Sequence, residues 1–173
     1  MTWGIPTEVF LQLHVVLSLI GILSGLVVLY GLVTGKLFGS WNALFLVTTV
    51  LTGVTGFPLA PFGLDPARIV GIILLVLLAV AVAALYAFRL AGAWRWIYVI
   101  AAVMSLYLNC FVAVVQSFQK LAFLQALAPT QSEPPFLIVQ VAVLAVFVVL
   151  GAVAAIRFRP QIAAAALALP KTL

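Results

Sequence analysis

The sequence lacks charge more than anything else. Charged residues make up 6% of its 173 positions, with three Asp or Glu against eight Lys or Arg, whereas 67% of the residues are hydrophobic. Soluble domains carry about 25% charged and about 45–50% apolar residues. A globule of this length with so few charges would not stay soluble, so we expect lipid to cover most of the surface. The net charge of +5 then indicates basic membrane-protein loops rather than a nucleic-acid partner.

Cysteine and histidine are almost missing, since Cys110 and His14 are the single residues of their types. One cysteine excludes an internal disulfide and a CxxC redox pair. One histidine excludes bis-histidine haem, and a zinc or copper site needs two or more His or Cys at similar depth. The motifs of hydrolases, nucleotide-binding loops and zinc proteases are also missing. The sequence therefore predicts no catalytic residue and no metal site.

Five apolar segments approach the roughly 20 residues that a membrane-spanning helix requires. We expect helices over about 9–33, 41–57, 67–88, 94–118 and 136–156. The connections between the first four are short, which makes sequential helices antiparallel neighbours. The stretch 119–128 is helical in character but polar, so it either extends the fourth helix or lies flat at the interface. The predicted fold is all-α, one domain over 1–173 that forms an up-down bundle of five transmembrane helices.

Two features near the ends of these segments refine this prediction. Asp65 precedes Pro66 in the pattern of a helix N-cap followed by proline at the first helical position. The apolar tail Ile162–Leu169 would be about 12 Å long as a helix, which is too short to cross a membrane.

The orientation follows from the distribution of basic residues over the loops. With the N-terminus outside, the cytoplasmic side receives Lys36, Arg89, Arg95, Arg157, Arg159 and Lys171. The outer side receives only Arg68 and Lys120, together with the acidic residues Glu8, Asp65 and Glu133. Because cytoplasmic loops carry the excess of Lys and Arg, we expect the N-terminus outside and the C-terminus in the cytoplasm.

With the sides assigned, uncharged polar side chains concentrate in the outer half of the membrane. They are Gln12, His14, Ser18, Thr52, Thr55, Asn109, Gln116 and Gln140. Polar groups in hydrocarbon cost free energy unless they are hydrogen-bonded, so these residues should face the bundle interior. They form either interhelical hydrogen bonds or a small ligand-binding cavity open to the outside. We favour interhelical hydrogen bonds, because uncharged amide side chains can donate to and accept from one another.

His14 is the side chain best suited to contact a cofactor near neutral pH. We predict no cofactor, and a lipid, a quinone or a pigment ligated by this single histidine remain as alternatives. The interpretation that we favour is a neutral His14 hydrogen-bonded to Gln, Asn or Ser.

Small residues recur on the first helix as Gly21-x-x-x-Gly25 and Gly31-x-x-x-Gly35. This spacing allows close helix approach, either within the chain, which we favour, or with another subunit. The third helix has no strongly polar residue between Ile69 and Leu85. We expect it to face lipid or a partner protein.

Two stretches carry a resemblance, LAPTQSEPPF (Leu127–Phe136) and AGAWRWIYVIAAVMSLYLN (Ala91–Asn109). They resemble a group of small bacterial inner-membrane proteins with no assigned activity. The resemblance implies a bacterial cytoplasmic (inner) membrane and transfers no functional residue.

The leading functional hypothesis is a non-catalytic integral membrane protein, an accessory or assembly subunit that contacts membrane lipid and other membrane protein subunits. A lipid or quinone-like ligand in the outer half is compatible with this role. The first alternative is a small transporter or channel-like facilitator for an uncharged or weakly polar solute, with a path past His14, Asn109, Gln116 and Gln140. Such a path requires polar lining through both halves of the membrane. The second alternative is a redox protein that binds a pigment or quinone at His14.

Overall fold

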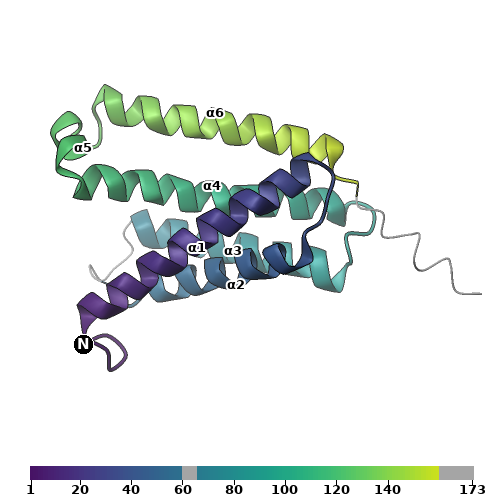
Figure 1. Cartoon of the computed structure of the whole chain (residues 1–173), viewed down its shortest axis with the longest axis horizontal. Coiled ribbons are helices and arrows are strands. Elements are labelled where there is room, and N and C mark those ends of the chain that lie inside the picture. Colours follow the sequence, from purple (N-terminus) through teal and green to yellow (C-terminus); the bar gives the residue numbers. More distant parts are fainter. Residues whose placement is uncertain (60–65, 160–173) are drawn as a thin grey trace, which may run out of the picture.

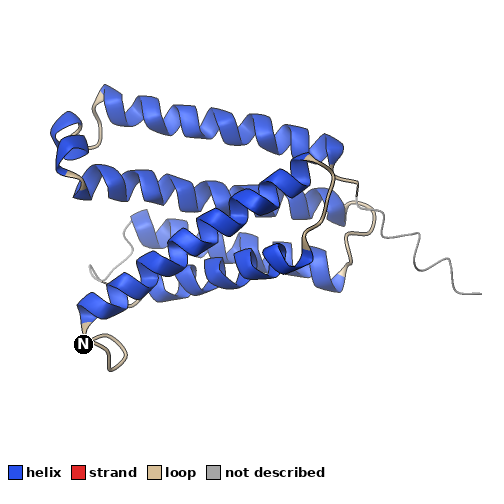
Figure 2. Ribbon diagram, in the orientation of Figure 1, coloured by secondary structure: helices blue, strands red, loops and turns tan. Residues whose placement is uncertain are grey.

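The structure, a computed structural model, describes residues 1–59 and 66–159. Within these ranges it is all-helical and contains no β-strand (Figures 1 and 2), which confirms the all-α class predicted from the sequence. The predictions for Asp65, Lys171 and the tail Ile162–Leu169 lie outside the described residues.

The helices follow the apolar segments of the sequence. They are α1 (Thr7–Val33), α2 (Gly39–Gly56), α3 (Pro66–Val82), the π-helix η1 (Ala83–Ala87), α4 (Trp94–Lys120), α5 (Ala122–Leu127) and α6 (Pro134–Arg157). The backbone of Leu121 is extended and separates α4 from α5. The stretch 119–128 therefore lengthens α4 by two residues and then forms a separate short helix.

Four helices are long and apolar enough to cross a membrane: α1, α3 with η1, α4 and α6. The described chain is thus that of a multi-pass membrane protein. Helix α2 has 18 residues and is not among the four, so the predicted count of five spans is not confirmed. The physical reason is that α2 carries polar side chains that are buried within the bundle, Asn42, Thr48, Thr49 and Thr52.

The long helices run alternately up and down the molecule (Figure 1). Helix α1 contacts α2, α4 and α6, and α4 contacts α1, α3 and α6, so α1 and α4 are the two central helices. Helix α2 lies against α1 on one side and α3 on the other. The short α5 lies at the end of the molecule where α4 ends and α6 begins (Figure 1).

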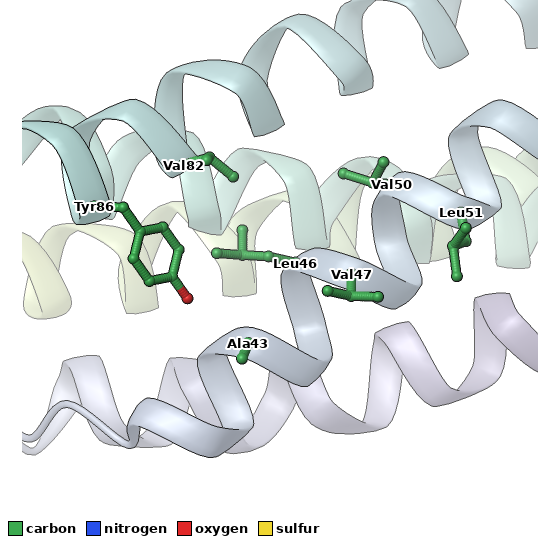
Figure 3. A pocket seen from close by; sticks show the side chains of 7 residues that line it. All are labelled: Ala43, Leu46, Val47, Val50, Leu51, Val82 and Tyr86. Carbon is green, nitrogen blue, oxygen red and sulfur yellow. The ribbon is translucent and has the colours of Figure 1, made fainter.

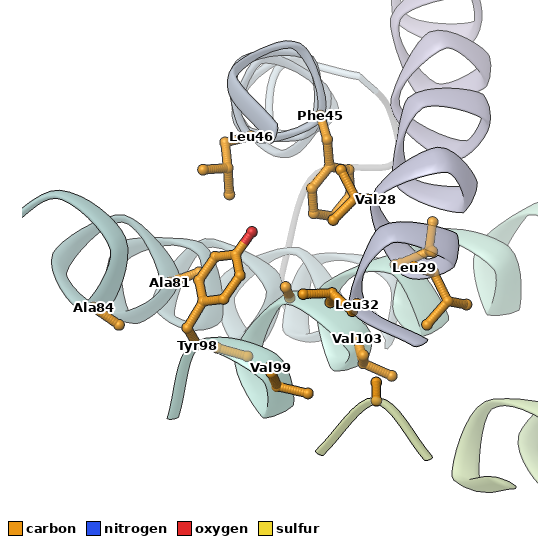
Figure 4. Close-up of a cluster of buried hydrophobic side chains, with 14 of the residues drawn as sticks. Val28, Leu29, Leu32, Phe45, Leu46, Ala81, Ala84, Tyr98, Val99 and Val103 are labelled. Carbon is orange, nitrogen blue, oxygen red and sulfur yellow. The ribbon is translucent and has the colours of Figure 1, made fainter. Parts of the chain in front are cut away.

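The main hydrophobic core lies where α1, α2, α3, η1 and α4 meet and extends to α6 through Phe147 and Ala154 (Figure 4). Its labelled members are Val28, Leu29, Leu32, Phe45, Leu46, Ala81, Ala84, Tyr98, Val99 and Val103. Gly25 makes the close packing of α1 possible, because a Cβ there would lie 2.5 Å from Cδ1 of Leu106 and 2.9 Å from the ring of Phe45. Gly21, Gly31 and Gly35 also face atoms of this chain. The glycine motifs of the first helix therefore serve packing within the chain.

Two arginines bind backbone carbonyls at helix C-termini. The guanidinium of Arg68 donates hydrogen bonds to the carbonyl oxygens of Phe57 and Leu59, each at 3.0 Å. Arg95 donates to the carbonyl oxygen of Phe158 at 2.7 Å. Cations at these positions also interact favourably with the helix dipole. They fix α3 to the end of α2 and α4 to the end of α6.

Candidate functional site

His14 and Thr55 join α1 to α2 near one end of the bundle. Nδ1 of His14 lies 2.9 Å from Oγ1 of Thr55, and the same hydroxyl donates to the carbonyl oxygen of Leu51 at 2.7 Å. A threonine hydroxyl has one proton to donate, so the proton in the first bond belongs to Nδ1 of His14. The sequence predicted Gln, Asn or Ser as the partner of His14, and the partner is Thr55. Nε2 is left as the acceptor atom of the imidazole.

Three of the predicted site residues do not join this pair. The hydroxyl of Ser18 donates to the carbonyl oxygen of His14 at 2.8 Å, and that of Thr52 donates to the carbonyl oxygen of Thr48 at 2.9 Å. Both bonds close one turn within a single helix, which satisfies the hydroxyl without linking helices. Gln12 is exposed on α1.

Asn109 forms a second link, at the meeting point of α1, α2 and α4. Its Nδ2 donates to Oγ1 of Thr49 at 3.5 Å, and both side chains are buried. Gly21 of α1 borders the pair, since a Cβ there would lie 3.1 Å from Oγ1 of Thr49 and 3.6 Å from Nδ2 of Asn109. A glycine at this position leaves the room that the polar pair occupies.

The two predicted glutamines of α4 and α6 are not brought together by hydrogen bonds. Nε2 of Gln140 donates to the carbonyl oxygen of Phe111 at 3.3 Å. Oε1 of Gln140 is buried without a hydrogen-bond partner among the described residues. Gln116 is half-buried and forms no side-chain hydrogen bond within the described chain. Gln140 therefore links α6 to α4, apart from the His14 and Asn109 pairs.

Sequence reasoning missed a buried polar pair toward the opposite end of the bundle. The hydroxyl of Tyr98 donates a hydrogen bond to Oδ1 of Asn42, and the two side chains are 0% and 2% exposed. The signal was present in the spacing. Asn42 and Thr49 are seven residues apart on α2, as are Tyr98 and Ser105 on α4, which places each pair on one helix face.

Ser105 lies on this face of α4, between Tyr98 and Asn109. It is fully buried, and its hydroxyl has no hydrogen-bond partner among the residues that the structure describes. Polar side chains thus extend along α2 and α4 at several levels, joining α2 to α4 at two of them and to α1 at a third. The predicted outer cluster is part of a longer series of interhelical links.

A hollow of another kind lies between α2 and the α3–η1 helix (Figure 3). Its volume is about 320 Å³, and it is lined by Ala43, Leu46, Val47, Val50, Leu51, Val82 and Tyr86. None of the predicted polar site residues lines it. The phenol hydroxyl of Tyr86 is the one polar side-chain group in this lining, so we refer to the hollow as the apolar groove.

Comparison of the chain with protein-family models, with curated proteins and with solved structures finds no match. The fold and the site therefore define only a class, that of a multi-pass helical membrane protein with polar links inside its bundle.

Proposed function

We propose that this chain is a non-catalytic integral membrane protein that serves as an accessory or assembly subunit of a larger membrane complex. The observation that carries the proposal is that three pairs of polar side chains inside the bundle bind each other across helices. The pairs His14–Thr55, Asn109–Thr49 and Asn42–Tyr98 each join two helices. Side chains used in this way stabilise the bundle, as in other membrane proteins, and are not presented to a substrate.

We further propose that α2 is a fifth span and that the protein lies in a bacterial inner membrane. Its N-terminus is then outside and its C-terminus in the cytoplasm. Helix α2 is about 27 Å long, close to the hydrocarbon thickness of about 30 Å. Its buried polar side chains are hydrogen-bonded, either to side chains of α4 or to carbonyl oxygens of α2 itself, so they do not oppose insertion. Lys36, Arg89, Arg95, Arg157 and Arg159 all lie beside the helix ends assigned to the cytoplasm, in accordance with the excess of basic residues expected there.

The partner helices are proposed to contact α6. Over an apolar stretch of 18 residues, only 17% of α6 is buried within the chain, compared with 22% for α3 with η1 and 44% for α4. Ala142, Ala145 and Ala152 are exposed on α6, and small residues favour close contact between membrane helices. The glycines of α1 are occupied within the chain, which leaves α6 as the small-residue surface for another subunit.

Purification of the tagged chain from its native membrane in mild detergent, followed by mass spectrometry of proteins and small molecules, tests this function. We expect other membrane proteins at a fixed ratio to the chain. Ala145→Phe should remove them, and Val76→Phe on the exposed face of α3 should not. A stable monomer that co-purifies with nothing would overturn the proposal.

A facilitator for an uncharged or weakly polar solute is the second candidate, and one observation favours it. The pair Asn42–Tyr98 adds buried polar groups to the half of the bundle opposite His14, as a solute path requires. If this function is correct, substitution of Asn109 and Gln116 by Leu reduces uptake by liposomes that contain the chain. Unchanged uptake would count against it.

A further inference from the structure

The apolar groove lies on a part of the bundle that faces outward. Val47 is 57% exposed and Tyr86 is 55% exposed, and both line the groove. Figure 3 shows Tyr86 at one end of the lining and Leu51 at the other, with the Tyr86 ring extending from η1 toward α2. The groove therefore opens sideways, where a multi-pass protein contacts lipid.

The length of the groove matches one leaflet of a membrane. Its lining on α2 begins at Ala43, four residues after the helix starts, and continues to Leu51. These eight residue steps correspond to about 12 Å along the helix. One leaflet contributes about 15 Å of hydrocarbon. A single acyl chain lying along α2 would contact the whole lining.

The turn that follows η1 carries a cation, Arg89, three residues after the groove residue Tyr86. The π-helix η1 ends at Ala87, and Arg89 follows with a φ of 48°, which is uncommon for a residue other than glycine. The turn is held by the amide of buried Leu90, which donates to the carbonyl oxygen of Ala84 at 2.9 Å, and by stacking of Phe88 on Trp94 with 3.7 Å between ring centroids. π-Helical turns and strained backbone frequently occur at functional sites.

We propose that the groove binds one acyl chain of an anionic phospholipid, whose phosphate is bound by Arg89. Tyr86, 55% exposed, supplies the amphipathic aromatic side chain typical of the headgroup level. The guanidinium matches the charge and the planar geometry of phosphate oxygens. This site depends on α2 and α3 crossing the membrane and is independent of the subunit role.

Native mass spectrometry of the purified full-length chain with defined lipids tests the site. Dioleoyl phosphatidylglycerol and dioleoyl phosphatidylcholine share their acyl chains, so a comparison of the two isolates the headgroup. We expect one retained phosphatidylglycerol, with about a fivefold preference for it that Arg89→Gln abolishes. Val47→Trp, which fills the groove, should weaken retention of both lipids about tenfold, the equivalent of displacing roughly two methylene groups.

Matched variants separate this site from general lipid contact. Val148→Trp on α6 replaces a similarly exposed valine, 61% exposed and outside the groove, and should leave retention unchanged. Arg159→Gln removes a cation from the same end of the molecule and should leave the preference unchanged. Equal losses of lipid retention in Val47→Trp and Val148→Trp would overturn the proposal. So would equal losses of the phosphatidylglycerol preference in Arg89→Gln and Arg159→Gln. So would cross-linking of two chains through Val47→Cys in a Cys110→Ala background, because protein rather than lipid would then cover the groove.

Discussion

The hydroxyl of Tyr98 donates its proton to Oδ1 of Asn42, and this bond ties α4 to α2 between two fully enclosed side chains. Nδ2 of the same Asn42 donates to the carbonyl oxygen of Phe38 at 2.8 Å, so both ends of the amide are bound. Asn42 thereby connects three parts of the chain: the turn before α2, α2 itself and α4.

Removal of this hydroxyl should destabilise the bundle. Tyr98→Phe leaves Oδ1 of Asn42 buried without a donor, and we expect a loss of about 1 kcal/mol in the free energy of unfolding. The double variant Tyr98→Phe, Asn42→Leu should lose less than the sum of the single variants, with a coupling energy of about 0.6 kcal/mol. Unfolding of the reconstituted protein with denaturing detergent measures both quantities. Additive losses would show that the pair makes no bond.

Gly25 should tolerate no side chain, because its position faces Phe45 and Leu106. We expect Gly25→Val to cost about 1–3 kcal/mol in the free energy of unfolding through overpacking. Leu106→Ala in the same chain should restore part of the loss by vacating the space. Gly39→Ala is the control, since no atom lies within 4 Å of a Cβ built there. Equal effects at Gly25 and Gly39 would contradict the packing.

His14 should be observable without interference because the chain has no other histidine. The bond to Thr55 predicts that the neutral imidazole carries its proton on Nδ1. Nitrogen-15 NMR of the histidine-labelled protein in bilayers measures the tautomer directly. Thr55→Val removes the acceptor and should move the proton to Nε2. A tautomer that does not respond to this substitution would mean that Thr55 does not hold the ring.

The connection before α6 should depend on pH through Glu133. Desolvation raises the pKa of this carboxyl, but the hydrogen bonds that it accepts, among them those from the amide and hydroxyl of Thr130 and from the amide of Ser132, together lower the pKa. A lowered pKa in the folded state means that these bonds stabilise the turn above the ordinary range of Glu and are lost as the pH falls through the lowered pKa. The protection factor of the Thr130 amide, its exchange rate relative to that of an unstructured peptide at the same pH, should therefore fall in acid, and Glu133→Gln should remove that dependence.

The long spans were predictable, and their tertiary contacts were not. The runs that became α1, α4 and α6 are long and strongly apolar, so their positions follow from composition alone. Helix α2 was harder, because it balances Asn42 and its threonines against apolar residues, and only their partners in space show that these groups are satisfied. The π-helical turn η1 has no signature in composition and arises where α3 turns toward α4.

The candidate site was also predictable only in part: its residues could be named from the sequence, but their partners could not. The assignment of sides placed Asn109 and His14 in the outer half as residues that should face the bundle interior, but the partners Thr49 and Thr55 come from a helix whose rotation the sequence does not define. Tyr98 was overlooked because a tyrosine near a helix end resembles an interfacial anchor. Its burial depends on Phe158 and Asn42, which are 60 and 56 positions away along the chain. Contacts at such separations are set by packing.

The central claim is that the buried polar side chains link helices and do not line a water-filled path or cavity. Cysteine accessibility measures this most directly, with Thr49→Cys and Asn109→Cys each placed in a Cys110→Ala background and exposed to a water-soluble maleimide in open membrane fragments, where the reagent reaches both sides. Lys36→Cys in the exposed turn before α2 serves as the reactive control. We predict that Lys36→Cys reacts at once and that the two buried positions react only after the bundle is unfolded. Rapid labelling of Thr49→Cys or Asn109→Cys in the folded protein would contradict the account.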